Sequence, residues 1–428
     1  MMPLSKIQQR YCERACAQID ENAIVEILRM LIDTPSPTGE EAPLAAAIAD
    51  HLTRHGLRGA VQPLDDRQAN ALGSIQGSTT GNSLLLYSPI DTVTSNDPGE
   101  DLPWAGADFT PDMQASSIVT GDNVIGLGAQ NPKGHAACII AAARALKSAE
   151  IPLVRDLLLG FGAGGMPTNA RRGTRIDSGH GIGCDRLLKE AFKPSRAIIA
   201  KSGWSVSWEE VGFVWYEVTV KGTHTYVGSR HLMPYVNPIN GAGKVIAALE
   251  DWFPEWTERH RSGLVAPQGV VSFIESGWER MPAFVPAVCR FRVDLRLSPR
   301  TLPQDADAAF GDRLREIADR LQVNLSWRRL IAIPGTTTTP THEVIQKCVQ
   351  AWEAVEGRAH QPVTGLSGAT DANILRAHGV PTARIGLPKS QAVALDFRQG
   401  MNTASIAAMK KLVQALIHAS VAMCTANE

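Results

Sequence analysis

The sequence lacks several features that mark whole classes of protein. Its seven cysteines are an odd number without a CxxC pair, which favours reduced thiols in a cytoplasm. No apolar run approaches the roughly 20 residues that a membrane helix needs. The amino-terminal stretch MMPLSKIQQRYCERACAQID has no apolar signal core. We therefore expect a cytoplasmic protein with no membrane partner.

The sequence also lacks an excess of charge of either sign. The formal net charge is −1, which gives no global field that would attract nucleic acid. Hydrophobic residues make up 44% and charged residues 20% of the chain, as in soluble globular proteins. A chain of 428 residues exceeds what one hydrophobic core usually serves, so two domains and no nucleic-acid partner are expected.

Two polar signatures stand on an apolar scaffold between Leu84 and Leu146. The first, LLLYSPIDTV, is an apolar run that ends in a polar tip with Pro89 and Asp91. The second, GLGAQNPKGH, opens a long alanine-rich helix. A strand with a polar tip, followed by a Gly-rich turn and a helix, is how open α/β sheets build sites at their carboxyl ends.

Local spacing predicts where several helices begin. Thr38 and Glu41 have capping-box spacing ahead of a helix that runs to about His55. Asn131 is placed to cap a helix from residue 132 to residue 147.

The middle of the chain changes in character. From about residue 208, strand-like and helix-like segments follow in the order β-α-β-β-α-β: 211–222, 238–253, 269–276, 288–297, 304–321 and 323–329. This predicts an α/β main domain, 1–207 and 331–428, interrupted by an inserted α+β domain at 208–330.

Several short motifs occur in an order that resembles a known family. They are LLLYSPIDTV, GLGAQNPKGH, VTVKG, Asn237 in YVNPI, Arg296 in VDLRLSP, Asp371 in SGATDA, and GVPTARIGLP. Together they resemble the zinc-dependent aminoacylase and carboxypeptidase family, which includes acetylornithine deacetylase, succinyl-diaminopimelate desuccinylase and glutamate carboxypeptidase. The resemblance implies a three-layer α/β/α catalytic domain, an inserted ferredoxin-like lid, and a homodimer formed through that lid.

The resemblance implies a paired zinc site, but the ligand positions are substituted. The expected histidine, bridging aspartate, Glu-Glu pair, further carboxylate and last histidine fall at Pro89, Asn131, Gly164 with Gly165, Lys201 and Arg398. A proline has no donor atom, and a neutral amide binds zinc poorly. We therefore expect no metal and no other cofactor. The lid histidine that steadies the transition state in the family falls at Tyr226, with His224 two residues earlier.

The substitutions remove carboxylates and add the cations Lys201 and Arg398 near Asp91. We expect a metal-free pocket for a small anionic, carboxylated molecule, because buried cations need a partner or an anionic ligand. The loop bearing Arg171, Arg172 and Arg175 would add positive charge. The candidate catalytic residues are Asp91, Lys201, Tyr226 and His224. The candidate substrate-binding residues are Asn131, Arg398, Asn237, Arg296 and Ser202.

Structural interpretations compete with these functional ones. Asp91 fits an Asx turn, Asn131 and Asp371 fit helix caps, and Lys133 and Arg296 fit ion pairs. Gly164 and Gly165 fit a tight turn. Cys184, with His180 nearby, is a possible nucleophile or a packed side chain.

These expectations combine into one leading hypothesis. It is a metal-independent hydrolase of an amide, ureido or related C–N bond in a small carboxylated substrate. Two alternatives remain open at this point: a lyase or isomerase on the same fold, and a non-catalytic descendant that binds an anion or serves as a scaffold.

Overall fold

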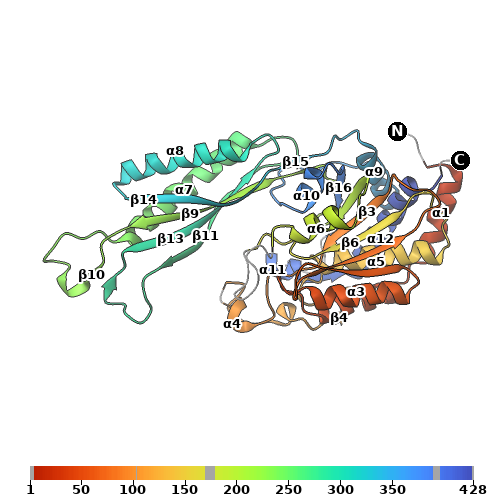
Figure 1. Ribbon diagram of the computed structural model, residues 1–428, viewed down its shortest axis with the longest axis horizontal. Helices are drawn as coiled ribbons and strands as arrows, with labels where there is room; N and C mark the ends of the chain where they lie inside the picture. Colours follow the sequence, from red (N-terminus) through yellow and green to blue (C-terminus); the bar gives the residue numbers. More distant parts are fainter. Residues whose placement is uncertain (1–3, 103, 169–178, 389–395, 427–428) are drawn as a thin grey trace. The chain divides into compact units, whose positions relative to one another are not determined.

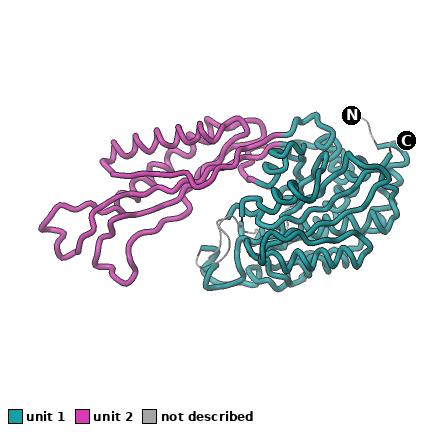
Figure 2. The backbone as a smooth tube through the Cα atoms, viewed as in Figure 1, with its two compact units in different colours: residues 1–208, 338–362, 370–428 teal, residues 209–337, 363–369 magenta. Residues whose placement is uncertain are grey.

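The computed structural model describes residues 4–102, 104–168, 179–388 and 396–426. The chain divides into two compact units (Figure 2). Unit 1 comprises residues 1–208, 338–362 and 370–428, and unit 2 comprises residues 209–337 and 363–369. Unit 1 has two groups of buried apolar side chains and unit 2 has one.

The inserted unit is longer at its carboxyl side than the predicted 208–330. β15 (Thr336–Thr337) pairs with β8 (Glu209–Glu210) at the base of unit 2. The 363–369 segment also joins unit 2, where Leu366 N–H donates to the Leu264 carbonyl. Both contacts involve pairings distant in sequence, which local periodicity does not reveal.

Unit 1 is built on a six-stranded mixed sheet (Figure 1). Its order is β1 (Arg58–Pro63), β2 (Ala69–Ile75), β6 (Leu157–Gly162), β3 (Leu84–Pro89), β7 (Arg196–Ala200) and β16 (Thr382–Ile385). The four strands from β6 to β16 run parallel to one another, and β2 runs antiparallel to both of its neighbours, β1 and β6. The parallel strands bring several carboxyl ends to one edge.

Helices cover both faces of this sheet. Successive side chains of a strand point to opposite faces, so the apolar side chains of the buried strand β3 need packing partners on both sides. Leu84 and Leu86 pack in one apolar cluster, and Leu85 and Tyr87 in another. The unit 1 helices are α1 (Lys6–Cys16), α2 (Glu21–Asp33), α3 (Ala42–Arg54), α4 (Pro98–Asp101), α5 (Lys133–Ser148), α6 (Ile182–Glu190), α9 (Glu343–Glu356), α10 (Ala372–Ala377), α11 (Phe397–Met401) and α12 (Ile406–Cys424). α5 and α12 contact β3, whereas α6 contacts β6 and α10 contacts β16. A small sheet of β17 (Thr403–Ser405), β5 (Asn123–Ile125) and β4 (Ile118–Thr120) completes the unit.

Helix α12 differs from the expectation that no segment could span a membrane. By length and composition alone it is apolar enough to do so. Two-thirds of its most apolar window, 67%, is nevertheless buried inside the protein, as in the core helix of a soluble domain. It is therefore weak support for a membrane span.

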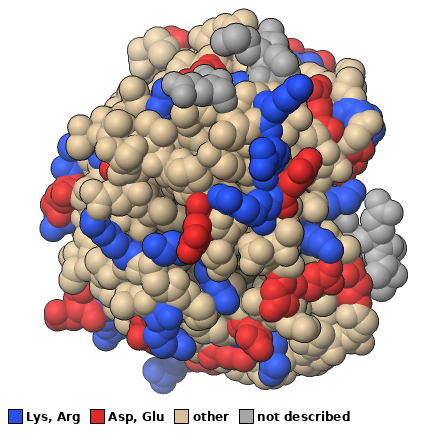
Figure 3. All heavy atoms as spheres, turned by 90° about the vertical axis from the view of Figure 1, so that its right-hand side faces the viewer, with Lys and Arg blue, Asp and Glu red and all other residues tan. Residues whose placement is uncertain are grey.

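Charges of both signs are intermixed on the face shown in Figure 3. The whole chain has 42 basic and 43 acidic side chains. The absence of a nucleic-acid partner stays a prediction.

Unit 2 has the predicted β-α-β-β-α-β order. The elements are β9 (Gly212–Lys221), α7 (Pro238–His260), β11 (Gly269–Ser276), β13 (Val288–Leu297), α8 (Pro303–Leu321) and β14 (Leu325–Ile333), with a short pair, β10 (Thr225–Tyr226) and β12 (Phe284–Val285). The four long strands form an antiparallel sheet in the order β11-β13-β9-β14. An α/β main domain with an inserted α+β domain is thus confirmed.

The two predicted helix caps are wrong. Helix α5 begins at Lys133 with Pro132 at the cap position, and no side chain caps it. At α3, Glu41 occupies the cap position without a capping hydrogen bond. The Thr38 hydroxyl instead donates to Asp91, since both side chains face a buried polar site.

Candidate functional site

A buried polar cluster lies where the parallel strands of unit 1 end. It consists of Glu41, Asp91, Lys201, Asp371 and Tyr87, and all five are between 0% and 6% exposed. Asp91 lies two residues after β3, Lys201 follows β7 directly, and Asp371 precedes α10. Carboxyl ends of parallel strands are the usual site of ligand binding in α/β sheets. The cluster is therefore the candidate active site.

Asp91 fixes the turn that follows β6. Its Oδ1 accepts from Gly165 N–H at 2.8 Å, and its Oδ2 accepts from Met166 N–H at 3.0 Å and from the Thr38 hydroxyl at 2.6 Å. Burial raises the pKa of Asp91, although these donors and the nearby Lys201 oppose the rise. Three donors on two oxygens give this carboxylate a structural role at least.

Glu41 holds the preceding residue of the same turn. Its Oε1 accepts from Gly164 N–H at 2.9 Å and from Gly39 N–H at 3.0 Å, and its Oε2 accepts from the Gln68 amide at 3.1 Å. Burial and the neighbouring Asp91 raise the pKa of Glu41. Two carboxylates thus bind three successive backbone N–H groups, those of residues 164–166.

Lys201 brings positive charge to these carboxylates. Its ammonium lies 3.5 Å from the Met166 sulfur, a weak acceptor. Its charge lowers the pKa of both Asp91 and Asp371, against the effect of burial. Lys201 thus acts electrostatically on both carboxyl groups of this cluster, and the catalytic roles of Lys201 and Asp91 stay predictions.

Asp371 and Tyr87 form the other side of the cluster. The Tyr87 hydroxyl donates to Asp371 Oδ2 at 2.6 Å. Burial raises the pKa of Asp371 to about 7 despite the Tyr87 bond and the charge of Lys201. Asp371 is at the cap position of α10, but its side chain makes no capping hydrogen bond, so the cap interpretation is wrong.

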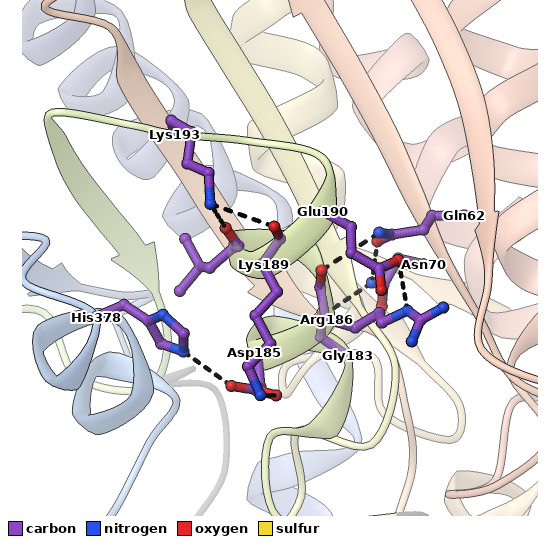
Figure 4. A network of polar contacts seen from close by, with 10 residues as sticks. Gln62, Asn70, Gly183, Asp185, Arg186, Lys189, Glu190, Lys193 and His378 are labelled. Atoms are coloured by element: carbon purple, nitrogen blue, oxygen red, sulfur yellow. Dashed lines mark hydrogen bonds and ion pairs between the residues drawn. The ribbon is translucent and has the colours of Figure 1, made fainter.

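A polar network tied to α6 holds the surrounding elements in place (Figure 4). The Asn70 amide nitrogen donates to the Gly183 carbonyl at 2.9 Å, and its oxygen accepts from Ala163 N–H at the end of β6. At the other side of α6, Asp185 lies 2.8 Å from the ring of His378, which ends α10. These contacts fix the β6 turn and the helix that follows Asp371.

The second signature contributes two further buried basic side chains, of which His135 interacts with Lys201. Lys133 donates to the Thr34 carbonyl at 2.9 Å, and burial lowers its pKa to about 7. The predicted ion pair of Lys133 is replaced by this backbone contact. His135 Nε2 accepts from Leu387 N–H, and burial with the cations Lys201 and Arg384 lowers its pKa to about 3. His135 is therefore neutral.

The other candidate residues in unit 1 have different surroundings. Asn131 is 8% exposed, and its amide nitrogen contacts the Met401 sulfur at 3.4 Å. Its Oδ1 is buried and accepts no hydrogen bond from the part of the chain that the structure describes. Ser202 is exposed. Arg398 pairs with Asp112 at 3.3 Å and contacts the Thr110 hydroxyl. Arg398 thus has an internal partner, and its role in anion binding stays a prediction.

The remaining candidates belong to unit 2. His224 is exposed, contacts the Val285 carbonyl and stacks on Phe284, and Tyr226 lies against the same ring. Asn237 caps α7 by accepting from Ile239 N–H, and Arg296 pairs with Asp294 at 2.8 Å. These contacts give Asn237 and Arg296 structural roles within unit 2.

Cys184 does not have the predicted reactive setting. It is fully buried in α6, and burial raises its pKa well above the ordinary value. A thiol that stays protonated is a poor nucleophile. Arg171, Arg172 and Arg175 lie outside the described residues.

The donor chemistry does not fit a zinc pair. Pro89 and Lys201 offer no ligand atom to a cation, and Asp91 is engaged by three hydrogen-bond donors. A Cβ at position 165 would lie 2.4 Å from Pro89 Cβ and 2.6 Å from Asp371 Oδ2. Across the described ranges, no three His, Cys, Asp or Glu side chains are grouped to hold a metal ion.

Sequence reasoning missed two members of the cluster, Glu41 and Tyr87, and weighed a third, Asp371, as either a helix cap or a site residue. Glu41 had only a local capping pattern, and its contacts with Gly39 and Gly164 depend on the fold. Tyr87 reads as an apolar strand residue. Asp371 stands in SGATDA, one of the motifs that carry the resemblance, and this was the one available signal.

Comparison with known proteins agrees with this architecture. A relative, the N-formyl-4-amino-5-aminomethyl-2-methylpyrimidine deformylase of Bacillus subtilis (strain 168), is 21% identical over 328 residues, covering 73% of this chain and 72% of the relative. The dipeptidase Dug1p of Saccharomyces cerevisiae shares the fold with a TM-score of 0.73 at 12% identity, covering 96% of this chain and 98% of its own. Human carnosine dipeptidase 1 has a TM-score of 0.69 at 13% identity, covering 96% and 99%. The model of Peptidase family M20/M25/M40 matches residues 85–419, and the chain belongs to this family of hydrolases.

Proposed function

We propose that the protein hydrolyses an amide or related C–N bond of a small, carboxylated N-acyl compound without a bound metal. One observation carries the proposal: Lys201, only 6% exposed, stands at a carboxyl strand end beside Asp91 and Asp371. A positive group fixed in a low-dielectric site can stabilise the oxyanion that forms when water attacks a carbonyl. Lys201 would thus supply the charge that zinc supplies in other members of the family.

The relatives support the class of bond. The Bacillus subtilis relative is named as a deformylase of an N-formyl compound, and the solved neighbours are named as dipeptidases. All of these names describe cleavage of a C–N bond. Because the Bacillus subtilis relative is named for removal of a formyl group, we favour small acyl groups, namely formyl, acetyl and carbamoyl, in the substrate.

A mass-spectrometric turnover screen tests the proposal. The purified protein would face N-formyl, N-acetyl and N-carbamoyl amino acids, each with and without a chelator, and matched amides that lack the carboxylate. We expect turnover that survives the chelator and that favours the carboxylated compounds. Turnover abolished by the chelator would contradict the metal-free chemistry, and no turnover at all would contradict the hydrolase.

The matched variants are Lys201→Met and Lys193→Met. Removing an oxyanion-stabilising donor lowers kcat by about 10²–10³-fold. Lys193 instead contacts the Leu188 and Lys189 carbonyls near the end of α6, so its loss should leave turnover unchanged (Figure 4). Equal rates for the two variants would exclude Lys201 from the chemistry.

We also propose a homodimer formed through unit 2. β11 is an edge strand of the unit 2 sheet, and its Val270, Phe273 and Ile274 are between 42% and 53% exposed. Exposed apolar edge strands pair readily with another chain. Light scattering after size exclusion should give a dimer that Ile274→Asp dissociates, whereas Val61→Asp on the unit 1 strand β1 should leave it intact. A monomeric wild-type protein would overturn this proposal.

A further inference from the structure

The hydrolysis proposed above needs a group that takes a proton from water and returns it to the leaving amine. Three buried carboxyl groups lie in the polar cluster, at Glu41, Asp91 and Asp371. Their hydrogen bonds distinguish them. Both oxygens of Glu41 and both oxygens of Asp91 accept bonds that hold the 164–166 turn or its surroundings.

Asp371 accepts fewer hydrogen bonds than the other two carboxyl groups. The Tyr87 hydroxyl engages Oδ2, and within the described part of the chain no donor contacts Oδ1. Asp371 also retains 4% exposure, whereas Glu41 and Asp91 are 0% exposed. A carboxyl group can exchange a proton with water only if a water molecule can reach one of its two oxygens.

The groups around Asp371 fix its orientation and its charge. Tyr87 comes from β3, Lys201 follows β7, Asp91 follows β3, and Cys184 comes from α6. The Tyr87 bond sets the carboxyl plane, and Lys201 places a cation beside it. Burial raises the pKa of Asp371 to about 7, so both protonation states are populated near neutral pH, as a group that accepts and donates a proton requires.

We propose that Asp371 is the catalytic acid–base residue of this site and that Tyr87 is its positioning residue. The proposal rests on the proposed hydrolase function. It assigns to Asp91, one of the four catalytic candidates from the sequence, the task of holding the β6 turn.

The proposed reaction balances without any further reactant. A water proton passes to the Asp371 carboxylate as the water oxygen bonds to the acyl carbon, and the C=O π electrons move to the oxygen beside Lys201. The C–N bond then breaks, the carbonyl re-forms, and the leaving nitrogen takes the proton from Asp371. The products are a carboxylic acid and an amine.

The test compares Asp371→Asn with Asp50→Asn on the best substrate of the screen. Loss of a positioned acid–base group lowers kcat by about 10²–10⁴-fold, and we expect KM to change by less than about threefold because Lys201 still binds the acyl oxygen. Asp50 forms a solvent-exposed pair with Arg54 on α3, so Asp50→Asn should keep the wild-type kcat. An Asp371→Asn enzyme with wild-type kcat would overturn the role of Asp371 and leave the hydrolase standing.

Tyr87→Phe gives a second readout that a merely structural role would not move. The Tyr87 bond lowers the pKa of Asp371, so its removal should shift the acid limb of the pH–rate profile to higher pH. An unshifted limb would overturn the proposal, and this variant decides the question if Asp371→Asn does not fold. A wild-type protein that turns over no compound would overturn the hydrolase and Asp371's role together.

Discussion

The two units stabilise buried carboxylates in opposite ways. In unit 1, backbone N–H groups and a hydroxyl hold Asp91, and burial raises its pKa. In unit 2, Glu217 on β9 accepts from Arg328 at 2.8 Å and lies 3.6 Å from Arg292, and the Arg328 hydrogen bond is the main cause of its lowered pKa. A guanidinium partner keeps a carboxylate charged, whereas neutral donors in a buried site leave it able to hold a proton.

This difference separates a stabilising surface from a reactive interior. The arginines on the unit 2 sheet are paired with carboxylates: Arg290 with Glu275, Arg292 and Arg328 with Glu217, and Arg296 with Asp294. The unit 1 cluster instead places the single cation Lys201 among three carboxyl groups. Groups with displaced pKa values beside a charge are frequent in active sites.

The largest expected effect on stability comes from Asp91→Ala. It would strand two buried backbone N–H groups, each at a cost of about 1–3 kcal/mol, and leave the Thr38 hydroxyl only its longer 3.3 Å bond to the Thr92 carbonyl. We expect urea denaturation to show a loss of about 3 kcal/mol or more. Asp50→Ala is the control, because Asp50 and Arg54 form a solvent-exposed pair. Similar losses for the two variants would mean that the cluster does not anchor the β6 turn.

A smaller effect is expected in the pH dependence of stability. Burial raises the pKa of Asp371 from its ordinary value of 3.8 to about 7 in the folded protein, so the folded state holds an extra proton between these pH values. Its contribution therefore makes stability fall as pH rises from about 4 to 7. Asp371→Asn should flatten this slope by about 1 kcal/mol or more between pH 5 and pH 8. The unfolding free energies of the wild type and of Asp371→Asn would be measured at pH 5 and pH 8. The same change between the two pH values in both proteins would contradict this prediction.

The smallest effect is expected for Glu217→Gln in unit 2. Its arginine partners are partly exposed, and such pairs contribute about 1 kcal/mol or less. Because the folded pKa of Glu217 is lowered, its contribution is present above pH 4.5 and is lost as pH falls through the folded value. Chemical denaturation at neutral pH should show that Glu217→Gln has a lower unfolding free energy than the wild type. In acid, where Glu217 of the wild type is protonated, this difference should disappear. A loss that persists in acid would indicate packing as its cause.

The sequence predicted the fold well because the informative signals are local. Strands β11 and β13 lie at the predicted residues, and α7 and α8 begin where expected, since alternation and helical spacing are short-range properties. The inserted domain followed from the order of these elements. The strands β1 and β2 were missed because their burial depends on pairing with distant parts of the chain.

The site was predicted only where the motif positions carry unusual residues. Asp91 and Lys201 were found because a strand end with a charge is visible in sequence. Glu41 escaped because its partners at 39 and 164 are joined to it only in the folded chain. The pairing of Arg398 with Asp112 was not foreseen, since Asp112 is 286 residues away and no local pattern pairs them.

The tight packing at Gly165 limits which residues the turn after β6 can accept. Any side chain at this position would place its Cβ 2.4 Å from Pro89 Cβ and 2.6 Å from Asp371 Oδ2, so the residues at 89 and 371 would have to move to admit it. Asp91, which accepts from Gly165 and Met166, ties the same turn to the end of β3. The turn is therefore closed to larger residues unless the strand end beside it changes as well.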